Sequence, residues 1–239
     1  MQRKFIAQLC SVNSVTPEPA ATRGWVNQQT NLYGEFVAEA TTGRAYQMRK
    51  RREDIEQTRQ RIIDAAVELH GSVGPINTTF SAVAERAGVQ RSTVYRHFTD
   101  EAALFSACTS HWLASHPWPR PDDWRAEPDP VNRLRRGLTE LYRFYAANTD
   151  MLANSFRDID VMPAFVGEFM HAQLRGIYNT LLEAWPDDAR DHYLTAAIAH
   201  ALDFRTWQSL SSQTLSAEAA AELLTTMVAG GLQARTAQA

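Results

Sequence analysis

The sequence is poor in cysteine and has no long hydrophobic run. Its two cysteines, Cys10 and Cys108, lie far apart among 239 residues, so neither a disulfide framework nor a zinc module is indicated. No window approaches the ~18 consecutive apolar residues of a membrane span, and no cleavage site of small residues follows the short apolar patch near the N-terminus. These absences favour a protein of the reducing cytoplasm that has no membrane partner.

The signatures of several enzyme classes are missing as well. The sequence has no glycine-rich phosphate loop, no metal-ligand cluster and no nucleophile elbow. His111 and His116 lie five residues apart across a predicted helix end and lack an obvious carboxylate or cysteine partner, which argues against a metal site. We therefore expect no enzyme, no metal and no cofactor, although catalytic residues dispersed along the chain would leave no such mark.

Charge is unevenly distributed along the chain, whose net charge is −3. Residues 44–100 hold ten Arg and Lys against seven Asp and Glu, whereas residues 101–239 hold eleven against seventeen. A local excess of three positive charges (10 − 7) is modest for a nucleic-acid binder. The four consecutive cations at residues 49–52 are either a solvated flank or an arm that contacts phosphates, and the sequence leaves both interpretations open.

The most informative stretch is TFSAVAERAGVQRSTVYRHFTDEAALF at residues 79–105. Thr79 is placed to cap a helix, and Gly88 follows the last periodic residue, where a left-handed conformation ends a helix without steric penalty. A second helix of about two turns follows at residues 90–96 and carries mainly hydrogen-bond donors. Donors on a short exposed helix suit phosphates and base edges in a major groove, which is the helix-turn-helix design.

At these residues the chain resembles the DNA-binding signature of the TetR family of bacterial transcriptional regulators. The resemblance implies an all-α fold, with an N-terminal three-helix helix-turn-helix domain followed by a helical domain that binds a ligand and dimerises. It also implies a double-stranded, palindromic DNA operator, and most often a repressor that a small-molecule inducer releases. The residues expected to face DNA are Thr79, Gln90, Arg91, Ser92, Thr93, Tyr95, Arg96 and His97.

One position departs from the family pattern. Members commonly carry a lysine that is aimed at the DNA backbone just after the loop that opens the next helix, and this chain has Glu101 there, beside Asp100. Carboxylates at a helix N-terminus favour the helix dipole, so the two residues predict a well-capped helix. They also repel phosphate, and for that reason we expect DNA affinity below the family norm.

The chain divides into four parts. Residues 1–47 show no sustained periodicity and are predicted to be a disordered extension; because Met48 resembles a family start, this segment is either a misassigned start or a real tail. Residues 48–99 form the predicted DNA-binding domain, with a first helix over 53–73. Residues 100–130 form a linking helix and a proline-rich loop. Residues 131–239 form the predicted ligand-binding and dimerisation domain.

In the second domain the pattern is helical throughout. Helices are predicted over 131–147, 151–156, 164–184, 187–210 and 217–229. By the family resemblance, 187–210 and 217–229 pair with a second copy in a four-helix bundle. A pocket for a flat or hydrophobic inducer is expected among the middle helices, lined by Tyr142, Tyr145, Phe156, Met162, Phe165, Phe169, His171 and Tyr178.

Two other functions compete with a ligand-responsive repressor. A dimeric small-molecule binder or interaction protein with weak or lost DNA affinity is compatible with Glu101 and with the small positive excess. An enzyme is the weakest alternative, because none of the motifs above supports it. Neither the inducer nor the operator sequence nor the sign of regulation can be obtained from one sequence.

Overall fold

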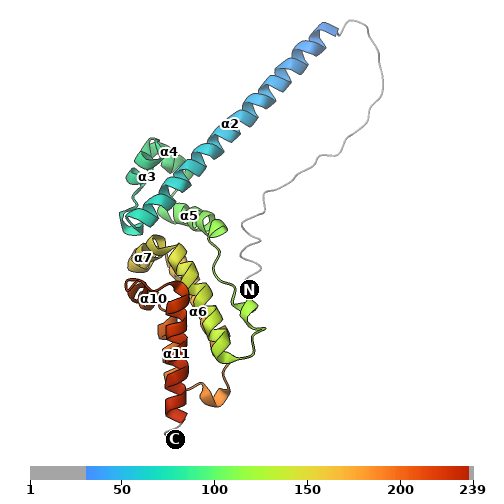
Figure 1. The fold of residues 1–239 in the computed structure, drawn as a ribbon. Helices are drawn as coiled ribbons and strands as arrows, with labels where there is room; N and C mark the ends of the chain where they lie inside the picture. The colour runs from blue at the N-terminus through green and yellow to red at the C-terminus, as the bar shows by residue number, and fades with distance from the viewer. Residues whose placement is uncertain (1–30, 237–239) are drawn as a thin grey trace. The chain divides into compact units, whose positions relative to one another are not determined.

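The computed structural model describes the backbone of residues 31–236 and the side chains of residues 46–235. Across residues 31–236 every regular element is a helix, which confirms the predicted all-α class (Figure 1). Within that range no helix is both long and apolar enough to cross a membrane. The chain forms two compact units, Met1–Arg52 and Glu53–Ala239, which are described separately.

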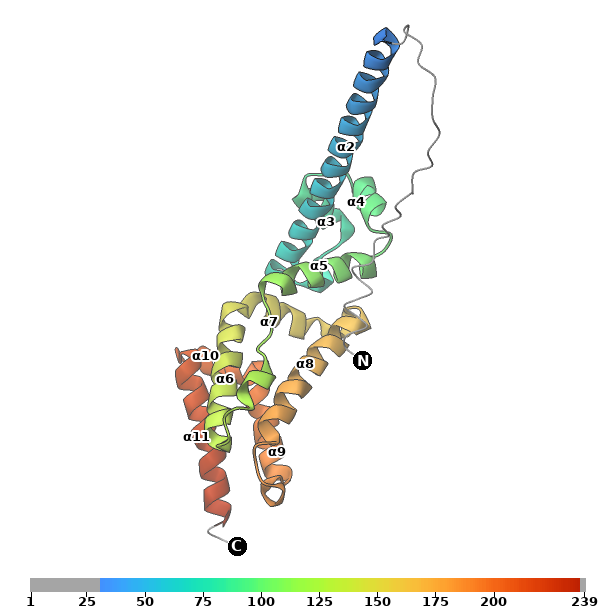
Figure 2. The ribbon, with the colours of Figure 1, turned by 90° about the vertical axis from the view of Figure 1, so that its right-hand side faces the viewer.

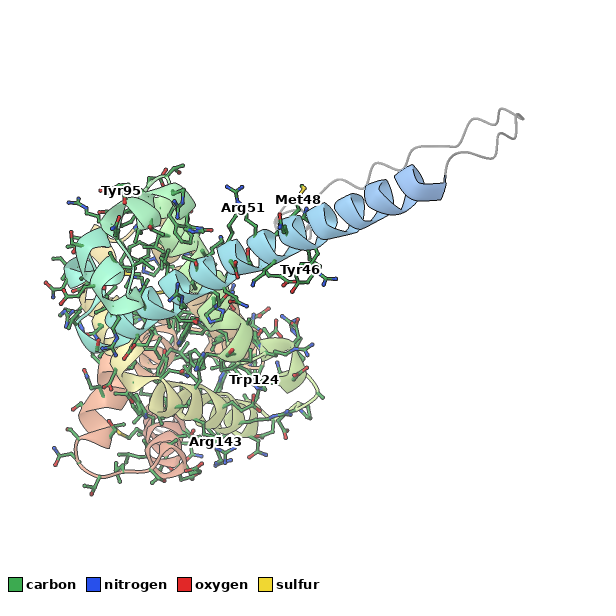
Figure 3. The ribbon with its side chains drawn as sticks, turned by 90° about the horizontal axis from the view of Figure 1, so that it is seen from above. Tyr46, Met48, Arg51, Tyr95, Trp124 and Arg143 are labelled. Carbon is green, nitrogen blue, oxygen red and sulfur yellow. The ribbon has the colours of Figure 1, made fainter. Side chains whose placement is uncertain are left out.

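The first helix, α2 (Asn31–Ser72), begins in the first unit and ends in the second. The prediction of disorder for residues 1–47 is therefore wrong for 31–47, while residues 1–30 lie outside the described part. No proline interrupts the chain between Pro19 and Pro75, and single glycines cost a helix only about 1 kcal/mol each. Residues 46–52 are exposed, and Tyr46, Met48 and Arg51 extend outward from the helix (Figure 3).

A small core joins four helices at the N-terminal end of the second unit. The second half of α2 packs with α3 (Phe80–Ala87), α4 (Arg91–His97) and the first half of α5 (Glu101–Ser115). Between α2 and α3 lies the short helix η1 (Pro75–Asn77). The fully or almost fully buried members are Ile62, Ala66, Val83, Val94, Phe98, Leu104 and Cys108. Burial of Leu104 and Cys108 makes the beginning of α5 part of this core as well as a link.

A larger core fills the rest of the unit. The helix η2 (Pro121–Trp124) precedes α6 (Pro130–Ala147), which runs beside α11 (Ala217–Thr236) along most of its length (Figure 1). The helices α7 (Thr149–Arg157), η3 (Ile159–Val161) and α8 (Ala164–Leu182) follow α6. Figure 2 shows α8 beside α9 (His192–Leu202). Trp124 and Leu138 are completely buried where these elements meet.

Two predicted helices of the C-terminal part are wrong in extent. Residues 187–210 form the short helix η4 (Asp187–Ala189), α9 and α10 (Phe204–Ser211), because Asp203 ends α9 and caps α10 by accepting a hydrogen bond from the Arg205 amide. The predicted stop at residue 229 is absent, since α11 continues to Thr236. Leu232 follows Gly230 and Gly231 and packs against the larger core. This packing favours a longer helix, although each glycine makes the helix less stable.

Candidate DNA interface and ligand cavity

The turn between α3 and α4 is built as the sequence predicts. The Thr79 hydroxyl accepts a hydrogen bond of 3.2 Å from the Ala82 amide and caps α3. Gly88 ends the helix in the left-handed region, with φ of 65°, and its amide bonds back to Glu85. An L side chain rarely adopts that backbone conformation, so glycine suits the position. The cap at Thr79 and the stop at Gly88 fix the two ends of α3 and therefore the point at which α4 can begin.

Two buried anchors hold α4 with one face outward. Val94 is fully buried and Phe98, just after the helix, is 2% exposed, so the Val94 side of α4 packs on α3 and the small core. A helix of two turns depends on such packing for its stability. Of the eight residues predicted to face DNA, six are exposed and two, Thr93 and His97, are partly exposed. The six exposed residues are Thr79, Gln90, Arg91, Ser92, Tyr95 and Arg96.

Arg91 and Tyr95 form a pair on the outer face of α4. The Arg91 Nη2 donates a 3.0 Å hydrogen bond to the Tyr95 hydroxyl, and the guanidinium lies 5.4 Å from the ring centroid. The Tyr95 ring in turn contacts Phe80 of α3, at 4.9 Å between centroids, while remaining 48% exposed (Figure 3). A cation and a phenol are thus held together where they can donate hydrogen bonds to a ligand outside.

His97 differs electrostatically from its arginine neighbours. Partial burial, followed by the charges of Arg96 and Arg59, lowers the pKa of His97 below its usual range. Arg59 of α2 lies over the Phe98 ring, 5.0 Å from the centroid. At neutral pH His97 is therefore a neutral hydrogen-bonding group, and the positive charge of this region comes from arginine side chains.

The acidic pair at the start of α5 acts as a cap, as predicted. Asp100 Oδ1 accepts a 2.8 Å hydrogen bond from the Ala103 amide, and Glu101 occupies the first turn. Both side chains are exposed. Two negative charges therefore lie close to the end of α4 in sequence, where they oppose an approaching phosphate.

An apolar cavity of about 60 Å³ lies between the helices of the small core and the larger core. One wall comes from α2, η1 and α5, and the other from α7, the loop before α8, and α8 itself. On the first wall and the following loop the lining residues are Val67, His70, Pro75, Phe105, Cys108, Thr109, Trp112, Leu113 and Trp118; on the second they are Met151, Leu152, Ser155, Met162, Val166, Phe169 and Met170. Drug-sized ligands occupy sites of about 300–1,000 Å³, so this cavity must open to receive one.

The titratable groups of the cavity are uncharged at neutral pH. Burial lowers the pKa of His70 to about 4, and its ring stacks on Phe105 with 4.7 Å between centroids. Burial likewise raises the pKa of the Cys108 thiol to about 12. With Ser155 and Thr109, these residues give an apolar site a few polar anchors and no formal charge. Such a lining suits an uncharged hydrophobic ligand.

Two residues predicted to line the pocket instead stabilise the larger core. Tyr142 and Tyr145 are completely buried, and their hydroxyls donate hydrogen bonds to the carbonyls of Ala201 and Leu202, at 2.7 and 2.9 Å. These bonds satisfy carbonyls at the end of α9, where the following Asp203 interrupts the helix. The prediction that both tyrosines face a ligand is wrong because their polar ends are already paired inside the protein.

The other predicted pocket residues separate into three groups. Met162 and Phe169 do line the cavity. Phe156 stacks on Phe204, with 5.2 Å between centroids, and Phe165 is 38% exposed, so neither belongs to it. His171 and Tyr178 lie in a separate, open hollow against α9, which also includes Leu174, Arg175, Ala199, Leu202 and Asp203.

The predicted pocket lacks the wall formed by α2, η1 and α5. It does not include His70, Phe105 and Trp112, which line the cavity from that side. A signal was present in α5, where apolar residues surround the helix on all sides instead of forming one stripe. A helix that is apolar all round is covered on two sides, here by the small core and by α7 and α8.

Parts of this sequence are similar to known proteins. Residues 62–108 match the model of "Bacterial regulatory proteins, tetR family". The chain is 40% identical over 58 residues to the HTH-type transcriptional regulator AcrR of Shigella flexneri, covering 24% of this chain and 27% of that protein. It is 31% identical over 96 residues to the HTH-type transcriptional regulator TtgR of Pseudomonas putida, covering 40% and 46% respectively.

The chain thus spans less than half the length of these curated relatives. The fold has a broader match: a TetR-like transcriptional regulator from Rhodococcus sp. RHA1 superposes with a TM-score of 0.53 at 20% identity, over 74% of this chain and 96% of that one. The matched segment of the family model contains the helix-turn-helix described above, with its capped α3, its glycine turn and its outward α4. Residues 62–108 therefore carry the DNA-binding domain of the TetR family of bacterial regulatory proteins.

Proposed function

We propose that this chain is a homodimeric transcriptional repressor that acts in the cytoplasm, binds a palindromic DNA operator and is released by a small hydrophobic ligand. The observation that carries the proposal is the outward face of α4. Buried Val94 and Phe98 fix the helix from behind, while arginine, glutamine, serine and tyrosine side chains stay exposed in front. This arrangement is typical of a recognition helix that enters the major groove.

The contacts divide by their chemistry. Gln90 and Arg91, at the N-terminal end of α4, are placed to reach base edges, since a recognition helix reads bases with its first residues. Tyr95 and His97 suit phosphate oxygens, as neutral donors that fix register without reading sequence. In a dimer, two copies of α4 about 34 Å apart would read half-sites one DNA turn apart.

Support for a dimer comes from apolar side chains left on the surface. Leu223 and Met227 lie one turn apart on α11 and are 40% and 62% exposed, and Tyr193 at the start of α9 is 55% exposed. Exposed apolar side chains grouped on a helix are a usual mark of an interface. We assign the dimer contact to the segments 187–210 and 217–229, now divided among α9, α10 and α11.

A ligand would act through the cavity between the two halves. At about 60 Å³ it holds no drug-sized molecule, so binding has to separate α2 and α5 from α7 and α8. A ligand that binds only the opened form stabilises that form by its difference in affinity. Release of DNA follows where the opened form misplaces α4 relative to its partner copy.

A selection from a random double-stranded DNA library with the full chain tests the proposal. We expect a palindrome to be enriched, and Arg91→Gln to weaken binding to it about 10- to 100-fold, the range of a lost bidentate base contact. Arg136→Gln is the matched control, because Arg136 is an exposed cation that pairs with Glu140 of the same helix, α6, outside both α4 and the segments assigned to the dimer contact. It should change affinity less than about twofold, as a rim charge does.

A protein that binds a ligand and has lost useful DNA affinity is the second candidate. Its specific support is the exposed Glu101 in the position where family members often carry a lysine. The same selection separates the two candidates. If no sequence is enriched at low salt, the repressor function is ruled out and the second candidate is favoured.

A further inference from the structure

The imidazole of His70 has no hydrogen-bond partner within residues 46–235, although it is buried. His70 belongs to α2 and is 7% exposed, and its ring stacks on Phe105 without pairing either ring nitrogen. The large majority of buried side-chain polar atoms in proteins do have a hydrogen-bond partner. Because His70 lies in the wall of the apolar cavity, a molecule bound there can supply the missing partner.

Ser155 of α7 presents a second unpaired group to the same cavity. It is 8% exposed, and its hydroxyl likewise has no partner in the part of the chain that the structure describes. Asn154, the preceding residue, donates a 3.2 Å hydrogen bond to the His70 carbonyl, so this part of α7 lies against the end of α2. Two unpaired polar side chains from facing helices therefore line one cavity.

Other polar groups of the protein interior behave differently. The Cys108 thiol, also in the cavity wall, already donates to the Ile63 carbonyl at 3.9 Å. Among the described residues, the polar side-chain atoms that are both unpaired and fully enclosed belong to Trp185, Trp207 and Thr225, and none of these residues lines the cavity. The polar atoms of His70 and Ser155 thus retain accessible surface that the enclosed groups lack.

The two unpaired groups indicate which function a ligand must carry. A neutral imidazole offers one acceptor and one donor nitrogen, and a serine hydroxyl both donates and accepts. A hydroxyl on the ligand can donate to His70 and accept from Ser155 at once, whereas an ether oxygen can only accept. A charged group is disfavoured, because burial keeps His70 and Cys108 uncharged and no described Asp, Glu, Lys or Arg lines the cavity.

The rest of the lining favours a flat ring. The rings of Phe105 and Phe169 lie on opposite walls, and three thioethers line the second wall, those of Met151, Met162 and Met170. Contacts between sulfur and aromatic rings are favourable. A cavity of about 150 Å³ holds one benzene ring, so this cavity of about 60 Å³ has to enlarge. Methionine has three rotatable bonds and can move aside without displacing the backbone.

From these observations we infer that His70 and Ser155 together anchor the hydroxyl of an uncharged phenol, whose ring occupies the methionine-lined part of the cavity. The inference rests on the ligand-binding part of the proposed function and names the class of molecule that is bound. The phenol donates its proton to a hydrogen bond with the imidazole and accepts one from the serine hydroxyl, so both side chains become paired on binding. His70 and Ser155 thereby distinguish a phenol from an ether of the same size.

Isothermal titration calorimetry of the full chain at pH 7.5, without DNA, tests the inference with two isomers. The probes are 4-ethylphenol and 4-methylanisole, which contain the same atoms, but only the phenol can donate a hydrogen bond. We expect wild type to bind the phenol about tenfold more tightly, the size of one hydrogen bond. His70→Phe keeps a ring against Phe105 and should lower this preference to less than about threefold. Ser155→Ala should do the same and leave the affinity for 4-methylanisole within about twofold of wild type, since the ether gains little from either group.

His171→Phe is the matched control, because His171 is an exposed histidine of α8 that lies outside the cavity and outside the segments assigned to the dimer contact. It should preserve the preference of wild type. Should His70→Phe lack a cooperative thermal transition, Ser155→Ala carries the test, since alanine is well tolerated within a helix.

Equal affinity of wild type for the two isomers, or a preference that survives both cavity substitutions, would overturn the inference and leave the cavity as a ligand site. Binding of neither isomer would also overturn the inference. The repressor function is decided separately by the DNA selection, which contains no ligand.

Discussion

Neutral His70 makes the stability of this protein depend on pH. The imidazole is 7% exposed, and burial lowers its pKa from 6.5 to about 4 in the folded chain. Between these values the unfolded chain binds a proton that the folded chain does not, so stability falls as pH falls from about 6.5 to about 4. This difference in pKa lowers the free energy of unfolding by about 3 kcal/mol once the pH is below about 4, and by about 1 kcal/mol at pH 5.5.

The assay is urea unfolding at pH 7.5 and 5.5, followed by circular dichroism at one protein concentration. We expect wild type to lose about 1 kcal/mol more than His70→Gln between the two pH values, because glutamine is similar in polarity but does not titrate. His200→Gln is the control, since His200 is exposed on α9 and its removal should preserve the wild-type difference. An equal pH dependence in His70→Gln and wild type would refute the reasoning.

The low pKa of His70 also indicates which class of ligand the cavity can bind. A cavity that keeps histidine neutral down to about pH 4 disfavours any buried charge that lacks a partner. We therefore expect uncharged hydrophobic molecules to raise the unfolding temperature at pH 7.5, and carboxylate analogues of the same size to have no effect. A comparable shift with the carboxylates would mean that another group in the site neutralises them.

Three further substitutions test separate parts of the structure. Glu101→Lys should tighten DNA binding to all sequences alike and steepen the salt dependence by up to roughly one unit; an unchanged slope in a salt titration would contradict this. Gly74→Ala should cost about 1–3 kcal/mol in urea unfolding, because its φ is 92° and its Cβ would overlap the Arg157 guanidinium, and stability equal to wild type would contradict that overlap. Tyr142→Phe should lose about 1 kcal/mol with the hydrogen bond to Ala201, whereas a ligand-lining tyrosine would lose little.

The helix-turn-helix was predictable because its signals are local. Thr79, Gly88 and Asp100 each act on backbone groups within four residues, so their roles follow from sequence spacing alone. The outward face of α4 followed for a similar reason, since Val94 is the one buried residue within the helix and its other residues are polar or amphipathic. Contact of that face with DNA stays a prediction.

The cavity was not predictable, because its walls come from residues far apart in the chain. His70 and Met162 meet only after α2 and the start of α8 are brought together, and periodicity within one helix does not tell which of two cores a residue joins. Tyr142 and Tyr145 illustrate the same limit. Their aromatic character suits a pocket, but their pairing with the carbonyls of Ala201 and Leu202 depends on a helix break that the sequence pattern did not indicate.

The pairing of Arg91 with Tyr95 has a consequence for the entropy of the proposed contact between Arg91 and DNA. A free arginine side chain carries about 2 kcal/mol of rotamer entropy, which it surrenders when it settles on a base. Here the hydroxyl and the ring of Tyr95 already restrict the motion of the guanidinium, and Phe80 of α3 packs against the tyrosine ring. In the proposed complex the arginine would therefore enter the groove partly ordered, and it would have less side-chain freedom left to lose.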